Sequence, residues 1–214
     1  MKVGILALFV LALVAMSCSS KESAEENKSK GEVNTAAEVA EEISMEVVNG
    51  ESFVDPRDNQ EYRYVKIGDA VWMKDNLRFA SNNSFCNQKY GGGCDKVGRY
   101  YKIEELPSLC PEGWRLPRAK DFNAMQKNCR KNPGFCLWHE YEKQGSDDIG
   151  FSALALGRYD LHVSKFSEVG ERAYFWSETS GSVKDVFTLK KGEYASSINR
   201  AEKSDAFTVR CVRN

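Results

Sequence analysis

Histidine is scarce in this sequence of 214 residues, which contains only His139 and His162. A nucleophilic serine or cysteine usually needs a neighbouring histidine base, and neither histidine lies in a recognisable nucleophile setting. The C-x2-C spacing of structural zinc sites is also absent. We therefore expect no catalytic residues and no zinc site, and we expect that the protein is not an enzyme.

Long apolar runs are missing as well. The longest, from Gly4 to Met16, has 13 residues, whereas a helix needs roughly 20 to cross a bilayer. A short apolar run after a basic residue is typical of a secretory signal peptide. The run ends in Val-Ala-Met-Ser-Cys at residues 14–18, which resembles the lipobox of bacterial lipoproteins. This resemblance implies that residues 1–17 are removed and that lipid on Cys18 anchors the mature chain to a membrane. An ordinary signal peptide is the alternative.

The segment 18–50 lacks aromatic residues, and it has no cysteine after Cys18. From residue 21 onward it holds eight glutamates and three lysines, a net charge of −5. Such a composition cannot bury a core, and it predicts a flexible, acidic linker. The acidic stretch 21–26 resembles signals that direct lipoproteins of Bacteroidetes-like lineages to the cell surface. We expect the chain to be held at the outer membrane or the cell surface.

A strong excess of positive charge is absent from residues 51–214. Removing Lys2 and the linker from the whole-chain charge of −1 leaves a charge of +3 for this part, which is no electrostatic footprint for nucleic acid. Its roughly 160 residues suffice for one domain with its own core. We therefore expect a single folded domain and no nucleic-acid partner.

Six cysteines follow the lipidation residue, and an even number indicates disulfides in an exported chain. Six cysteines allow 15 pairings. Turn-like sequence separates two pairs of close neighbours, and the two cysteines that remain would close a loop of about 100 residues. The expected bridges are Cys86–Cys94, Cys129–Cys136 and Cys110–Cys211.

Short alternating runs dominate the expected domain. Residues 62–67 and 70–73 flank Gly68-Asp69 and predict a β-hairpin. Phe122, Met125 and Cys129 share one face at helical spacing, which predicts a helix over 118–129. Further strands are expected at 150–155, 173–177, 186–189, 194–198 and 206–212, with a turn at Lys191-Gly192. Many strands and one or two short helices indicate an α+β fold.

Six ordered blocks carry a family resemblance: YVKIG with VWM and NLR (64–78), GRYY (98–101), CPEGWRLP (110–117), DIGFSA (148–153), YFWS (174–177) and FTVRCV (207–212). They resemble the Fibrobacter succinogenes major paralogous domain over nearly the whole of residues 51–214. That family resembles the C-type lectin-like fold, which formylglycine-generating enzymes share. The resemblance implies twisted antiparallel sheets, long loops and terminal strands that meet. The sequence departs from the family pattern around Phe122 and in residues 138–144.

The family resemblance does not imply an activity. Formylglycine-generating enzymes use reduced cysteines with copper, whereas all six domain cysteines are expected in bridges. The paired Glu-Pro-Asn and Trp-Asn-Asp tripeptides with which C-type lectins bind sugar and calcium are absent. We expect no cofactor and no metal; calcium is the alternative, with Asp147, Asp148 and Glu178 as its candidate oxygen ligands.

The aromatic residues separate into two groups. The tryptophans of the family blocks, Trp72, Trp114 and Trp176, are expected to be core. Trp138, Tyr141 and Tyr159 lie outside the blocks, in a region of long loops, and Trp138 is expected to be partly exposed because its neighbours are polar. We expect these last three to contact a polysaccharide or another envelope component, so that the protein acts as a binding or adhesion module. An envelope enzyme, such as a hydrolase, and a purely structural envelope lipoprotein are the alternatives.

Overall fold

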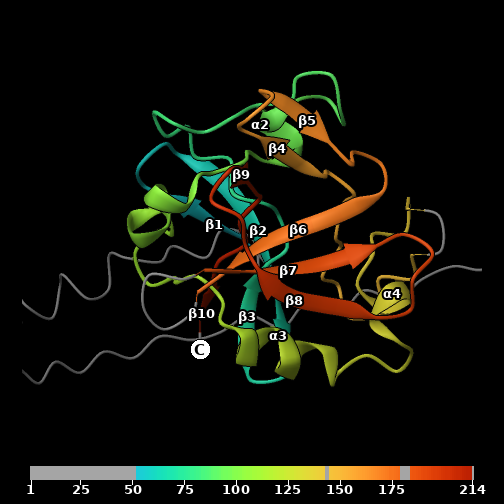
Figure 1. The fold of residues 1–214 in the computed structure, drawn as a ribbon. Coiled ribbons are helices and arrows are strands. Elements are labelled where there is room, and N and C mark those ends of the chain that lie inside the picture. The colour runs from blue at the N-terminus through green and yellow to red at the C-terminus, as the bar shows by residue number, and fades with distance from the viewer. Residues whose placement is uncertain (1–51, 143–144, 179–183, 214) are drawn as a thin grey trace, which may run out of the picture.

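The computed structural model describes residues 52–142, 145–178 and 184–213 (Figure 1). The expected signal peptide, the expected lipidation residue Cys18 and the expected linker lie outside the described residues. Within the described part, no helix is long and apolar enough to cross a membrane.

Three strands begin the described chain, four short helices follow, and seven strands complete it. In order they are β1 (Ser52–Asp55), β2 (Gln60–Ile67), β3 (Ala70–Met73), α2 (Cys94–Val97), the 3-10 helix η1 (Ile103–Ser108), α3 (Ala119–Gln126), α4 (Pro133–Cys136), β4 (Arg158–Asp160), β5 (Lys165–Ser167), β6 (Arg172–Ser177), β7 (Asp185–Lys190), β8 (Ser196–Arg200), β9 (Asp205–Ala206) and β10 (Val212–Arg213).

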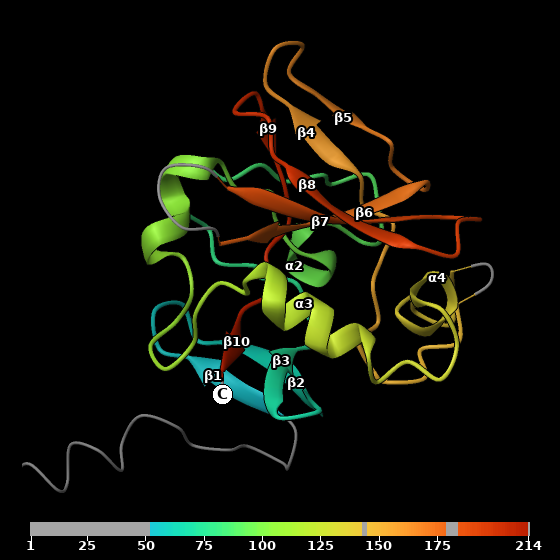
Figure 2. The same cartoon turned by 60° about the horizontal axis from the view of Figure 1, so that its bottom comes forward.

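The strands form three antiparallel sheets, with the orders β1-β2-β3-β10, β5-β4-β9 and β6-β7-β8. The last strand pairs with an early one, since Val212 of β10 lies opposite Trp72 of β3. Figure 2 shows the β6-β7-β8 sheet between the β4–β5 hairpin and the β2–β3 hairpin. The described domain is therefore mostly antiparallel sheet with a few short helices.

The predicted β2–β3 hairpin is confirmed. Gly68 in its turn has a φ of 62°, a left-handed conformation that glycine adopts without strain. The register pairs Ile67 with Ala70. Because side chains alternate between the two faces of a strand, this register buries Ile67 and Trp72 on the same side.

Helix α3 joins the first sheet to the third through Phe122. The Phe122 ring lies between Trp72 and Phe187, at centroid distances of 5.1 and 4.3 Å. Met125, one turn further on, is also buried. The predicted helix over 118–129 is thus confirmed in its position and its buried face, and it is shorter than expected.

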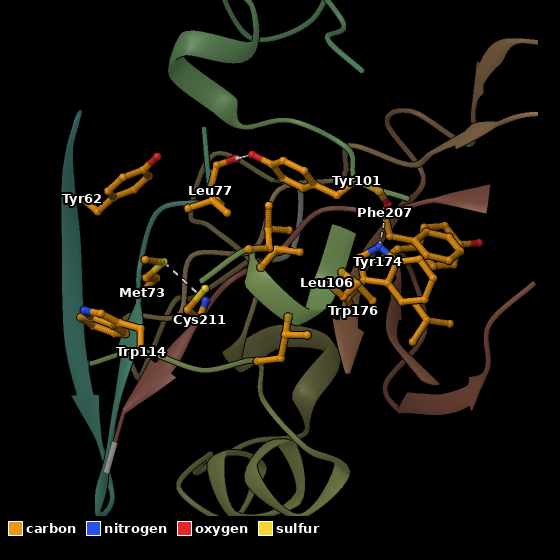
Figure 3. Packing of buried hydrophobic residues seen from close by; sticks show 14 of the residues in the cluster. Tyr62, Met73, Leu77, Tyr101, Leu106, Trp114, Tyr174, Trp176, Phe207 and Cys211 are labelled. Atoms are coloured by element: carbon orange, nitrogen blue, oxygen red, sulfur yellow. Dashed lines mark hydrogen bonds between the residues drawn. The ribbon is translucent and has the colours of Figure 1, made fainter. Parts of the chain in front are cut away.

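Figure 3 shows the buried cluster that connects the first sheet with the third. In it the Tyr101 hydroxyl donates to the carbonyl of Leu77 at 3.1 Å, and the Tyr101 carbonyl accepts a hydrogen bond from Trp176 Nε1 at 2.8 Å. Trp72, Trp114 and Trp176 are at most 7% exposed. The prediction that these tryptophans form the scaffold is confirmed.

Three disulfides hold the described domain together, and all three were expected from the sequence: Cys86–Cys94, Cys110–Cys211 and Cys129–Cys136. The second of them spans 101 residues and ties the chain before Trp114 to the residue before β10.

A buried arginine holds a loop where a strand was predicted. Arg210 is 1% exposed, and its guanidinium donates to the carbonyls of Phe151 and Ser152 and, at 2.7 Å, to Oδ1 of Asn76. Burial lowers the pKa of Arg210 to about 10, so it stays protonated at neutral pH. Residues 150–155, predicted as a strand, instead form a loop held by these bonds, in which Ser152 has a φ of 54°.

Other boundaries differ from the predicted ones. β8 begins two residues later than expected, and the expected strand 206–212 is divided into β9 and β10, with isolated bridges between them at Phe207 and Thr208. The sequence did not predict β1, β4 and β5. These strands have three or four residues. Such short segments become strands because they pair with neighbouring strands, and their own amino-acid composition gives little signal.

Candidate functional site

Helix α4 is fixed onto the turn between β7 and β8. It lies within the ring closed by Cys129–Cys136 and starts at Pro133, whose φ already suits the first helical position. The backbone N–H of Gly134 donates to the carbonyl of Tyr194 at 3.0 Å. A Cβ on Gly134 would collide with the carbonyl of Glu193, so this close approach requires glycine.

The loop after α4 turns Trp138 into the core. Its backbone forms a parallel bridge to Ala153, in which His139 N–H donates at 2.9 Å and Leu137 O accepts at 2.8 Å. Trp138 is 1% exposed and belongs to the same buried cluster as Phe175. The expected partial exposure of Trp138 is therefore wrong. A side chain with almost no exposed surface offers no face to a sugar.

Tyr141 lies on the surface of the same loop, with 86% of its surface exposed. Its ring stacks on His139 at a centroid distance of 4.5 Å, and its N–H donates to Nδ1 of His139 at 3.1 Å. The next side chain, Glu142, is buried, accepts the N–H of Ala155 at 3.0 Å and forms an ion pair with Lys191. An exposed tyrosine is thus displayed on an anchored loop.

Tyr194 is the second exposed aromatic side chain, at 65%. It packs against Phe135 at a centroid distance of 5.4 Å. Figures 1 and 2 both place the β7–β8 turn beside α4, at one end of the domain. Tyr141 and Tyr194 are the two exposed aromatic residues of the described chain. We call Phe135, His139, Tyr141 and Tyr194 the aromatic end.

Tyr159 lies in another part of the domain. It is on β4, opposite Ala206 of β9, and its half-buried ring stacks on Phe85 at 3.9 Å. Of the three residues expected to contact a ligand, only Tyr141 therefore lies at the aromatic end. Tyr194 was predicted to lie in a strand and not at a binding surface, although the Lys191-Gly192 turn indicated that the residues just after it lie at a hairpin tip.

A charged network links β4, β6 and β9. Arg158 donates to Asp205 at 2.6 Å and to Glu168 at 3.1 Å, and Glu168 also accepts from the Tyr174 hydroxyl at 2.7 Å. Burial raises the pKa of Asp205 against the effect of Arg158, and burial together with Glu168 raises the pKa of Tyr174 to about 12. These groups line a hollow of about 250 Å³. Because each of the four bonds another, the network holds β4, β6 and β9 together.

Two of the three candidate calcium ligands have protein partners. The Asp147 carboxylate accepts from the Ser152 N–H at 2.6 Å and from the Ser152 hydroxyl, and Glu178 pairs with Arg118 at 3.1 Å. Asp148 is exposed. Among the residues that the structure describes, no three or more histidine, cysteine or acidic side chains gather to hold a metal ion.

The comparisons with known proteins identify a family. A family model described as Fibrobacter succinogenes major domain matches residues 65–213, which include β3, the aromatic end and Cys110–Cys211. The comparisons with curated proteins and with solved structures give no match. Because the matched segment is more than half of the chain, the protein belongs to the Fibrobacter succinogenes major domain family.

Proposed function

We propose that this protein is a polysaccharide-binding module, anchored through lipid on Cys18 and displayed at the outer membrane or cell surface, with the aromatic end as its contact surface. One observation carries the proposal: the two exposed tyrosines of the described chain stand on neighbouring segments, which the Glu142–Lys191 ion pair joins. A tyrosine offers a flat apolar face and a polar hydroxyl, which suits a sugar ring. Because both tyrosines stand on anchored segments, little conformational freedom is lost on binding.

We propose further that the domain has a C-type lectin-like arrangement. The pairing of β10 with β3 supports it, since the two ends of the domain meet in one sheet. The described residues between β3 and β4 also support it, because they form a long excursion built of short helices, isolated bridges and loops. A loop-rich excursion on a sheet scaffold is where binding residues are usually found.

The binding proposal predicts the effect of two substitutions. Tyr141→Ala and Tyr194→Ala should each weaken binding to the cognate polysaccharide by about 1–2 kcal/mol, about five- to thirty-fold in Kd. The melting temperature should barely change, because both side chains are exposed. A glycan array and polysaccharide pull-down with the full chain in mild detergent would provide the ligand and the Kd values.

Val163 supplies the matched control. It is apolar and 57% exposed, and it lies after β4, outside the aromatic end. Val163→Ala should leave binding unchanged. A Tyr141→Ala/Tyr194→Ala double variant that binds as tightly as the wild type would refute the aromatic end as the contact surface.

The anchoring proposal is tested separately with Cys18→Ala. The variant should lose incorporation of a palmitate analogue and leave the membrane fraction, because each buried methylene of an attached chain contributes about 0.8 kcal/mol to membrane binding. The three disulfides should form as in the wild type. Retention of the lipid label by the variant would rule out Cys18 as the modified residue.

A further inference from the structure

A basic hollow is lined in part by the disulfide ring that contains α4. Its volume is about 650 Å³, and its lining includes Lys66 from β2, Arg130 and Lys131 from the ring before α4, and Asp148. All four of these charged residues are exposed. The hollow thus carries three positive charges and one negative charge.

The three cations have no carboxylate partner within 4.0 Å among the described residues. Elsewhere in the same domain Arg115 and Arg158 each bind a carboxylate at 2.6 Å. Like charges that share a hollow repel one another, and a bound anion would relieve this repulsion. The charge of the hollow therefore favours an anionic ligand.

The hollow and the aromatic end share one structural element. In the ring closed by Cys129–Cys136, Arg130 and Lys131 precede α4 in the sequence, and Phe135 lies in α4. Cys136 is completely buried, which fixes the ring to the core. Phe135, on which Tyr194 packs, follows Lys131 by four residues in this ring, so only a few residues of chain separate the aromatic end from two cations of the hollow.

We propose that the polysaccharide bound at the aromatic end is acidic, and that Lys66, Arg130 and Lys131 bind the carboxylates of its uronic acid units. This inference rests on the proposed function and names its ligand class. A concave site of about 650 Å³ lies within the range of pockets that enclose small ligands or short segments of a chain. A flat bilayer surface fits such a hollow less well.

The domain contains a matched control for this charge. A second hollow, of about 930 Å³, is lined by Lys184, Arg200 and Lys203 together with Glu202. Lys184 precedes β7 and Arg200 ends β8, so these residues lie at the end of the hairpin opposite the aromatic end. Removing them takes away the same charge at a distance from the proposed site.

The test compares polygalacturonate with its methyl ester, in which the same sugar chain has lost its charge. With the full chain in mild detergent at low salt, the wild type should bind the acid form about tenfold more tightly. The Lys66→Ala/Arg130→Ala/Lys131→Ala variant should lose this preference. The Lys184→Ala/Arg200→Ala/Lys203→Ala variant should keep it, and neither variant should melt earlier than the wild type.

Several outcomes would overturn the inference. Equal losses in the two triple variants would mean that only the net charge matters, and a wild type without preference or without binding to the acid form would exclude an acidic ligand. Tighter binding to phosphatidylglycerol vesicles than to polygalacturonate, lost in the first triple variant, would assign the hollow to a membrane surface.

The tyrosine variant separates failure of this inference from failure of the proposed function. If the Tyr141→Ala/Tyr194→Ala variant weakens binding to both polymer forms while the first triple variant keeps the preference, only the acidic ligand class fails. If the tyrosine variant binds as the wild type does, the proposed function fails.

Discussion

Replacement of Trp138 by alanine is expected to lower the free energy of unfolding by about 3–5 kcal/mol. The side chain is 1% exposed and packs in the cluster that contains Phe122, Phe151 and Phe175. Its removal would leave a cavity that the disulfide ring on one side and the Ala153 bridge on the other prevent from collapsing. Chemical denaturation of the full chain would measure the loss, and the slope of the transition should stay unchanged if only stability is affected.

Two comparisons make this result specific. Trp138→Phe should cost less than Trp138→Ala, because it keeps most of the buried area and removes an indole N–H that has no hydrogen-bond partner in the described structure. Tyr141→Ala, three residues further on at an 86% exposed position, should change stability by less than about 0.5 kcal/mol. A loss below about 1 kcal/mol for Trp138→Ala would mean that this side chain is not part of the core.

Removal of the Cys110–Cys211 bridge by a double alanine substitution is expected to cost about 4–5 kcal/mol. The bridge spans 101 residues, and the entropy of closing a loop in the unfolded chain grows with its length. Cys211 is also fully buried and lies next to β10, where the end of the chain pairs with β3. Equilibrium denaturation of the variant and the wild type would give the difference.

The Cys86–Cys94 bridge is the control, since it spans only 8 residues. The same loop-closure relation gives a cost of about 2–3 kcal/mol for its removal. The long bridge should therefore matter more than the short one. Equal costs for the two bridges would contradict loop length as the main cause of the difference.

The sequence by itself determined the features that depend on local pattern. Alternation around Gly68-Asp69 predicted the β2–β3 hairpin, and helical spacing of Phe122 and Met125 predicted the buried face of α3. The number and spacing of the cysteines predicted the three disulfides, and the ordered blocks indicated the family. Each of these signals lies within a short stretch of chain or in a count, so no knowledge of distant partners was needed.

Only the tertiary structure decided which aromatic side chains are available to a ligand. Trp138 and Tyr141 lie in the same loop, among the same polar neighbours, yet the bridge to Ala153 buries the first and exposes the second. Tyr194 joins the aromatic end because Gly134, 60 residues earlier, lets α4 approach its backbone. Arg210 holds residues 150–155 as a loop through bonds to carbonyls more than 50 residues away. Exposure depends on such long-range contacts, whereas a local pattern records only the residues next to one another in the chain.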